Sequence, residues 1–247
     1  EIVIIGPAGI KSIQTSPAAR RAFCIFEFIY FARPDSTFYG QNVYLTRKAH
    51  GRRLAQEAPV EADFVMPFPD SGTYAALGYS EASGIPFEMG MIRNHYVGRT
   101  FIQPTQSMRD FGVRIKLNPV KNLLKGKDII IIEDSIIRGT TVRTRVKALR
   151  ELGVRKVHMR VSGPPHRFPC HYGIDFSTRG ELIAARKTVE ELREFLGLDS
   201  LYYLSIDGLL KATEFKSPET NFCKACFDGC YPVAFDKQLT KSCLESD

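Results

Sequence analysis

The chain has 247 residues, of which 44% are hydrophobic and 25% charged, and its formal net charge is +7. This composition is typical of a globular protein with one main core. Residues 1–6 lack a secretory signal, and the chain has no apolar run of about 18 residues that could cross a membrane. Basic residues are spread out rather than gathered in the block typical of a nucleic-acid-binding arm. The net charge would favour polyanionic ligands but alone supports only a solvated surface. We therefore expect a cytoplasmic protein with no nucleic-acid or membrane partner.

The first elements in chain order are a strand and a helix. The opening residues EIVII predict a strand that needs a pairing partner, from which we expect further sequence upstream in the native protein. Residues 42–58 predict a helix with Val43, Ala49 and Leu54 among its apolar positions and cations on the other face.

The next segments alternate between short β-rich runs and helical patterns. Residues 62–66 predict a strand, residues 67–72 a turn, and the Ala-rich segment that follows a helix ended by Gly84. Residues 86–92 predict another strand, and a short helix is predicted near 105–111. This alternation favours βα units around a parallel sheet.

The clearest unit lies in the middle of the chain. Ile129–Ile132 form a continuous apolar run, typical of a strand covered on both faces, and two acids follow it. Residues 141–152 carry apolar side chains at helical spacing, Gly153 supplies the stop, and residues 157–161 alternate as a strand. This is a complete βαβ unit.

The last elements are a helix and a strand. Thr188 and Glu191 predict a capping box for a helix over 189–196, and residues 201–204 predict a strand. From Phe215 onward, Ser, Pro, Gly and Cys interrupt every period. The predicted organisation is an N-terminal segment 1–40, a mostly parallel α/β domain 41–212 flanked by helices, and an irregular Cys-containing extension 213–247.

The βαβ unit carries the main site motif. Glu133 and Asp134 end the strand, at the edge where open α/β sheets bind ligands. The turn at Gly139, with Thr140 and Thr141, can surround a phosphate at the positive end of the helix. The acids instead suit a magnesium-associated pyrophosphate or ribose hydroxyls. Together these features describe 5-phosphoribosyl-1-pyrophosphate (PRPP).

This segment resembles the PRPP-binding loop of the type I phosphoribosyltransferases: an apolar run, two acids, small residues and a closing Gly-Thr-Thr. A simple helix cap is the alternative, but it would not explain four isoleucines that end in two acids. The resemblance implies a type I phosphoribosyltransferase fold for 41–212. Two further loops suit the same sheet edge: the turn at Asp70 and Ser71, and residues 93–104, whose length and cations suit a closing loop.

Further segments resemble the glutamine-dependent amidophosphoribosyltransferases over nearly the whole chain, from about residue 10 to residue 232. They are 28–36, 54–57, 94–103, 172–175 and 207–211, together with the PRPP loop. The resemblance implies transfer of the phosphoribosyl group from PRPP to ammonia, the first step of de novo purine synthesis, by a homo-oligomer. Because the glutaminase domain of that family is absent from this sequence, we expect the chain alone to use free ammonia and not to hydrolyse glutamine.

The resemblance also assigns the site residues. Those expected at magnesium are Ser71, Glu133 and Asp134; those at PRPP are Asp70, Ser71, Glu133, Asp134, Ser135, Arg138, Gly139, Thr140 and Thr141; those on the closing loop are Arg93, Tyr96 and Arg99. Three positions depart from the family pattern: Glu133 stands where Asp is usual, His95 where Arg is more frequent, and Arg93 where Lys is frequent.

The cysteines indicate a second cofactor. Cys223 and Cys226 form a CxxC motif, which alone is weak. One branch of the amidophosphoribosyltransferases holds a 4Fe-4S cluster, and the resemblance places its four thiolates at Cys24, Cys170, Cys223 and Cys226. Zinc at the same ligands is the alternative, ahead of empty buried thiols. Cys230 and Cys243 have no assigned role.

Two other functions are compatible with a PRPP loop. A nucleobase phosphoribosyltransferase would need an aromatic-binding hood that the sequence does not reveal. A regulatory protein that binds PRPP without turnover usually adds a nucleic-acid-binding module, and no helix-turn-helix is evident. The enzyme is therefore the favoured prediction.

Overall fold

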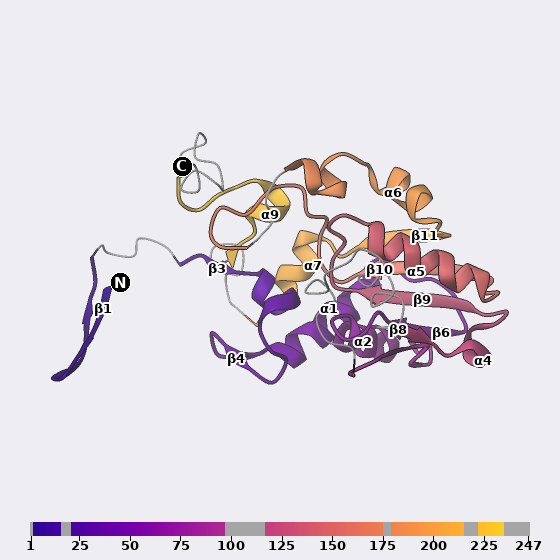
Figure 1. The fold of residues 1–247 in the computed structure, drawn as a ribbon, viewed down its shortest axis with the longest axis horizontal. Coiled ribbons are helices and arrows are strands. Elements are labelled where there is room, and N and C mark those ends of the chain that lie inside the picture. The colour runs from indigo at the N-terminus through magenta and orange to yellow at the C-terminus, as the bar shows by residue number, and fades with distance from the viewer. Residues whose placement is uncertain (1, 16–20, 97–116, 175–178, 215–221, 235–247) are drawn as a thin grey trace.

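A parallel four-stranded sheet forms the centre of the computed structural model, which describes residues 2–15, 21–96, 117–174, 179–214 and 222–234 (Figure 1). The strand order is β11-β10-β9-β6. The strands are β6 (Phe64–Pro67), β9 (Asp128–Glu133), β10 (Lys156–Val161) and β11 (Ser200–Tyr203). The predicted mostly parallel sheet is therefore confirmed.

Helices cover both faces of the sheet, which explains the continuous isoleucine run of β9. Ile129 and Ile131 face one core cluster, and Ile130 and Ile132 face the other; all four are fully buried. The first cluster includes residues of α5 (Thr140–Glu151) and α6 (Val189–Leu196), and the second includes residues of α1 (Val43–Glu57), α2 (Thr73–Ser83) and α7 (Ile206–Lys211). A strand buried on both faces needs no polar alternation.

The predicted helix boundaries are confirmed where local chemistry defines them. The Asn42 side chain accepts a hydrogen bond from the N–H of Leu45 and so begins α1. Gly84, with φ of 73°, ends α2 in the left-handed conformation. Thr188 and Glu191 form the predicted capping box of α6.

Helices α1 and α2 meet at two glycines. A β-carbon on Gly51 would lie 1.9 Å from the carbonyl oxygen of Ala75, and one on Gly78 would lie 1.9 Å from that of Lys48. Each helix thus approaches the backbone of the other more closely than any side chain would allow. The prediction that the cations of α1 lie on a polar face is wrong for Arg47, which is buried and donates to carbonyl oxygens of the segment around residues 27–32.

The strand predicted over residues 86–92 is largely absent from the sheet. Phe87 forms only a single bridge to Val65. The regular strand is β7 (Met91–Arg93), which pairs antiparallel with β8 (Leu117–Pro119) in a separate two-stranded sheet. Gly90 packs against the side chain of Met66 at this point, where a β-carbon would lie 2.7 Å from the sulfur. The short helix predicted near 105–111 lies outside the described residues.

The strand β10 is buried on both faces, although its sequence alternates. Val157, Met159 and Val161 face the first core cluster as predicted, but His158 and Arg160 are buried as well. The Arg160 Nε donates to the carbonyl oxygen of Ala58 at 2.9 Å. The buried guanidinium therefore has a hydrogen-bond partner within the protein.

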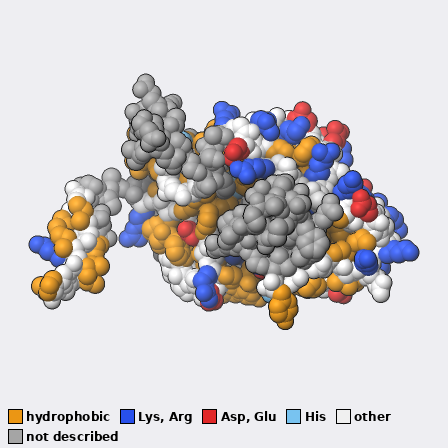
Figure 2. Space-filling view, in the orientation of Figure 1, with side chains coloured by type: hydrophobic (Ala, Val, Ile, Leu, Met, Phe, Trp, Pro, Cys, Tyr) orange, Lys and Arg blue, Asp and Glu red, His pale blue; other side chains and the backbone are white. Residues whose placement is uncertain are grey.

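The opening strand finds its partner in the next segment. β1 (Ile2–Gly6) pairs antiparallel with β2 (Gly9–Ile13), and every residue of both strands is exposed. Figure 2 shows the apolar side chains of this hairpin on the surface. Its isoleucines therefore contribute nothing to the core.

Short elements complete the fold. β3 (Phe23–Cys24), within the predicted segment 1–40, pairs in parallel with β12 (Phe222–Cys223), within the predicted extension 213–247. The others are η1 (Glu27–Phe31), β4 (Thr37–Phe38), β5 (Gln41–Asn42), α4 (Lys121–Leu124), η3 (Arg179–Glu181), η4 (Ile183–Ala185) and α9 (Ala225–Asp228). Within the described ranges, no helix combines the length and apolarity needed to span a bilayer.

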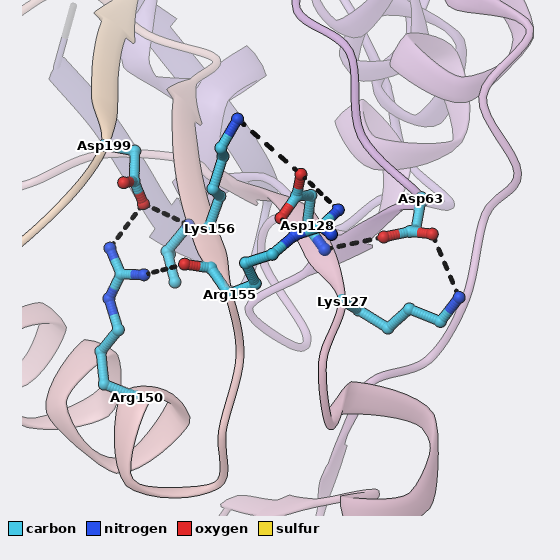
Figure 3. A network of polar contacts seen from close by, with 8 residues as sticks. Asp63, Lys127, Asp128, Arg150, Arg155, Lys156 and Asp199 are labelled. Carbon is cyan, nitrogen blue, oxygen red and sulfur yellow. Dashed lines mark hydrogen bonds and ion pairs between the residues drawn. The ribbon is translucent and has the colours of Figure 1, made fainter.

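Charged residues close the amino edge of the sheet (Figure 3). Asp128 pairs with Arg155 at 2.6 Å, and Asp63 accepts from the backbone N–H of Asp128 at 2.8 Å. Beside them, Asp199 accepts from Arg150 and from the backbone N–H of Val157. These acids are therefore paired with the protein's own cations and amides.

Candidate active site at the carboxyl edge of the sheet

Two adjacent carboxylates end strand β9. Glu133 is 6% exposed and Asp134 is 5% exposed. Burial raises the pKa of Glu133 well above its ordinary range, the charge of Asp134 raises it further, and the charge of Arg145 opposes this shift. The surroundings of Glu133 therefore disfavour its charged form, and a cation bound beside it would stabilise that form.

The loop after β6 reaches these acids. The Ser71 hydroxyl donates to Oε1 of Glu133 at 3.3 Å, although the two residues are far apart in sequence. The loop can approach because residue 72 is glycine: a β-carbon there would lie 2.2 Å from the carbonyl oxygen of Ile132. Asp70 on the same loop is exposed. The structure thus brings together the predicted residues Ser71 and Glu133.

The predicted phosphate turn joins β9 to α5. Ser135 donates to Asp134. Gly139 has φ of 76° and precedes the first turn of α5, which has no side-chain cap. Helix N-termini of this kind present free N–H groups and positive partial charge to an anion. Thr140 and Thr141 are exposed there, whereas Arg138 points to Glu181, with which it pairs at 2.9 Å.

Arg145 is a site residue that the sequence analysis missed. Its Nη1 lies 3.6 Å from Oε2 of Glu133, and its guanidinium lies over the Phe68 ring, 4.9 Å from the centroid. The sequence could have indicated this residue by its spacing. Arg145 follows Thr141 by one helical turn and therefore lies on the same side of α5.

Arg47 is a second missed residue. It donates to the carbonyl oxygens of Phe28 at 3.0 Å and Ala32 at 2.7 Å, which fixes the segment around η1. Burial lowers the pKa of Arg47, and the charge of Asp134 opposes the shift. Its position on a helix with three other cations, Lys48, Arg52 and Arg53, hid this role in the sequence.

A cavity of about 800 Å³ opens beside these groups. Its lining includes Asp70, Ser71, Arg47, Arg93 and Arg145. Glu133 and Asp134 do not line it themselves, but Ser71 and Arg145 contact Glu133 directly. A second cavity of about 620 Å³ runs along α5 and includes Thr140, Thr141 and Arg145. These volumes suit a small polar ligand.

The closing-loop residues are only partly described. Arg93 donates to Asp70, so it lies at the larger cavity. Tyr96 is fully exposed and contacts none of the acids. Arg99 lies outside the described residues. The structure thus brings Arg93 to the site and leaves Tyr96 apart from it.

The four cysteines gather around the β3 and β12 pair. Cys24 lies directly opposite Cys223, and the carbonyl of Cys226 accepts from the N–H of Phe168, two positions before Cys170. Burial raises the pKa of Cys24 to about 11, and the neighbouring Cys223 contributes to the shift. Burial also raises the pKa of Cys226, with further contributions from the other three thiols.

Neither predicted metal site is complete in protein ligands. Among the residues described, no group of three or more His, Cys, Asp or Glu side chains is close enough to hold a metal ion. At the acid pair, two carboxylates and the Ser71 hydroxyl are a donor set that suits Mg²⁺, which commonly takes its other ligands from phosphate and water. At the cysteines, the pairing of β3 with β12 puts Cys24 opposite Cys223. Cys230 is exposed, and Cys243 lies outside the described part of the chain.

Comparison with known proteins identifies close relatives. The chain is 54% identical to an amidophosphoribosyltransferase of Synechococcus elongatus over 244 residues, which are 99% of this chain and 49% of that protein. It is 51% identical to the amidophosphoribosyltransferase of Bacillus subtilis over 235 residues, 94% of this chain and 49% of that protein. The chain therefore spans about half the length of the curated relatives it matches. No family model matches it.

Solved structures agree with these matches. A B. subtilis glutamine PRPP amidotransferase, complexed with ADP and GMP, superposes with a TM-score of 0.84 at 49% identity, over 95% of this chain and 52% of that one. A structure described as the allosteric regulatory enzyme of purine biosynthesis gives a TM-score of 0.85 at 48% identity, over 95% and 51%. The fold is therefore that of the phosphoribosyltransferase part of these proteins.

Proposed function

Because the chain belongs to the amidophosphoribosyltransferase family, we propose that it transfers the phosphoribosyl group of PRPP to ammonia, giving 5-phosphoribosylamine and pyrophosphate. The observation that carries this proposal is the contact between Ser71 and Glu133, which joins two loops at one edge of a parallel sheet. That edge combines buried anions for a metal with cations and free amides for phosphates.

The 5-phosphate would bind at the turn between β9 and α5. The N–H groups at the start of α5 and the hydroxyls of Thr140 and Thr141 provide donors, and the helix dipole favours the anion. Asp134 is close enough to this turn to accept a hydrogen bond from Ser135, and its carboxylate suits the ribose hydroxyls.

The pyrophosphate would bind in the larger cavity. Ser71, Glu133 and Asp134 would hold Mg²⁺ at the side of this cavity where Ser71 contacts Glu133, and the ion would neutralise and orient the leaving pyrophosphate. Arg93 pairs with Asp70 at this cavity and can exchange that carboxylate for a phosphate oxygen. We propose that Arg93, Tyr96 and Arg99 close over the substrate and exclude water.

The reaction needs little proton transfer from the protein. Ammonia's lone pair forms the bond to the anomeric carbon as the bond to pyrophosphate breaks, with inversion, and the extra proton passes to solvent. Glu133 and Asp134 would stabilise the developing positive charge on the sugar, and Arg93 would stabilise the developing negative charge on the pyrophosphate. Positioning and electrostatics are therefore the main contributions of the chain.

We also propose a 4Fe-4S cluster on Cys24, Cys170, Cys223 and Cys226, with a structural role. The pairing of β3 with β12 supports this proposal, because it brings Cys24 opposite Cys223, which belongs to the same CxxC motif as Cys226. The family relationship further supports a homo-oligomer that acts in the cytoplasm; light scattering of the purified protein tests the first of these.

Pyrophosphate release tests the function. The purified chain is incubated with PRPP, MgCl₂ and ammonium chloride, and in parallel with glutamine or a nucleobase in place of ammonium. We expect release that depends on ammonium. Release only with a nucleobase would identify a different phosphoribosyltransferase, and PRPP binding without any release would indicate a regulatory protein.

A further inference from the structure

Arg145 occupies an unusual position beside the acid pair. Its Nη1 lies 3.6 Å from Oε2 of Glu133, within ion-pair distance but beyond a hydrogen bond. The guanidinium lies over the ring of Phe68, which is completely buried. Since the side chain of Arg145 is 27% exposed, it reaches both the buried carboxylate and the solvent-accessible cavities.

The two oxygens of Glu133 face different partners. Oε1 accepts from the Ser71 hydroxyl at 3.3 Å and from the Asp134 backbone N–H at 3.3 Å. Oε2 faces Arg145. A buried carboxylate with a second acid beside it requires a positive neighbour, and within the described structure Arg145 is the cation that pairs with it.

A metal ion bound at the acid pair would compete with Arg145 for the carboxylate of Glu133. Both are positive, so a divalent cation on the carboxylate of Glu133 repels the guanidinium and weakens the ion pair. Arg145 has space to move, because it lines both the cavity that contains Arg93 and the cavity along α5 that contains Lys147. Its long side chain can change rotamer without moving the helix.

We propose that Arg145 is a positioning residue that serves as an internal counter-cation for Glu133: it orients the carboxylate when no metal is bound, and a divalent cation displaces it. This deepens the proposed function and rests on the metal role assigned there to Glu133 and Asp134. Metal affinity is therefore set by a competition between Arg145 and the incoming ion.

Binding of Mn²⁺ to the purified chain without PRPP tests the competition. Free Mn²⁺ is measured by its electron paramagnetic resonance signal, which is independent of enzymatic activity. Arg145→Met removes the competing charge and keeps an apolar side chain against Phe68, so we expect the half-saturating Mn²⁺ concentration to fall about tenfold, a change of about 1.4 kcal/mol. Unchanged or weaker Mn²⁺ binding would overturn the proposal.

Arg143→Met is the matched control. Arg143 lies on the same helix, and its guanidinium also lies over an aromatic ring, 4.6 Å from the centroid of Phe195. This ring contact does not involve the acid pair. Its Mn²⁺ binding should equal that of the unaltered chain. An equal gain in both variants would show a general charge effect and would overturn the specific role of Arg145.

Two further measurements separate the possible failures. Asp134→Asn should abolish this Mn²⁺ binding; if it does not, the metal assignment of the proposed function is wrong, and the present inference falls with it. If Arg145→Met does not fold, crystals of the unaltered protein with and without Mn²⁺ give the same test. The distance from Arg145 to Glu133, 3.6 Å, should then exceed ion-pair range when the metal is bound. An intact pair beside a bound ion would overturn the proposal.

Discussion

Ser71 donates its hydroxyl hydrogen bond to Glu133 across 62 positions of sequence. One residue follows β6 and the other ends β9, and the two strands are neighbours in the sheet. The contact exists because parallel strands end at a common edge. The contact brings the loop after β6 and the end of β9 together in one candidate site. The first prediction concerns the acids of this site.

Asp134→Asn should reduce ammonia-dependent pyrophosphate release by about 100-fold or more, because the amide removes a charge from the proposed metal and ribose contacts. Initial rates at saturating PRPP and MgCl₂ measure the effect. Asp63→Asn is the control, since Asp63 is an acid at the opposite edge of the sheet that pairs with Lys127. Full activity in Asp134→Asn would refute the site assignment.

Gly51→Ala should destabilise the fold. The new β-carbon would lie 1.9 Å from the carbonyl oxygen of Ala75, so α1 and α2 must separate. We expect the free energy of unfolding to fall by about 2 kcal/mol or more, as for other overpacked contacts. Urea titration followed by circular dichroism measures this. Gly6→Ala is the control, because a β-carbon there meets nothing within 4 Å; equal stability of both variants would contradict the close helix contact.

His50 should make the fold sensitive to acid. It is completely buried, and burial lowers its pKa from 6.5 to about 3. Between these values the unfolded chain gains a proton at His50 that the folded chain does not, so stability falls as pH decreases through about 6.5 and continues to fall towards 3. At pH 5 the loss due to His50 is about 2 kcal/mol.

His50→Leu should therefore lose less stability between pH 7 and pH 5 than the unaltered chain. Urea titrations at both pH values measure the difference. The control is His95→Leu, which removes an exposed imidazole. If His50→Leu follows the same pH profile as the unaltered chain, His50 is not the source of the acid sensitivity.

Cys24→Ser should lower the iron and labile sulfide content of protein purified without oxygen, because it removes one of the four proposed thiolates. The brown colour should be lost in parallel. Cys230→Ser serves as the comparison, since Cys230 is exposed and lies outside the proposed set. Colourless unaltered protein that contains zinc would instead support the zinc alternative.

Local chemistry explains which parts of the fold the sequence could predict. Cap residues such as Asn42 and Gly84 act within a few positions, and the isoleucines of β9 are buried on both faces, so these elements follow from short windows of sequence. The strand predicted over 86–92 was wrong because β7 pairs with β8 rather than with the main sheet. Such pairing depends on sequence-distant partners that a local window does not contain.

In the candidate site, too, local motifs could be predicted from the sequence and sequence-distant contacts could not. Glu133, Asp134 and the Gly139 turn are contiguous, so one motif predicted them together. Arg145 and Arg47 belong to helices with many other cations, and only the packing distinguishes them: one meets a buried acid and the other meets backbone carbonyls. The roles assigned to Arg93, Tyr96 and Arg99 remain predictions.

The pairing of Phe23–Cys24 with Phe222–Cys223 also affects how the chain folds during synthesis. The ribosome makes the first pair of residues before any strand of the main sheet, and the second pair after all four of them. β3 therefore has no strand partner until residues 222–223 have been synthesised, because the segment that pairs with it does not yet exist. Because closing so long a loop is entropically costly, we expect this pair to form after the more local contacts of the sheet.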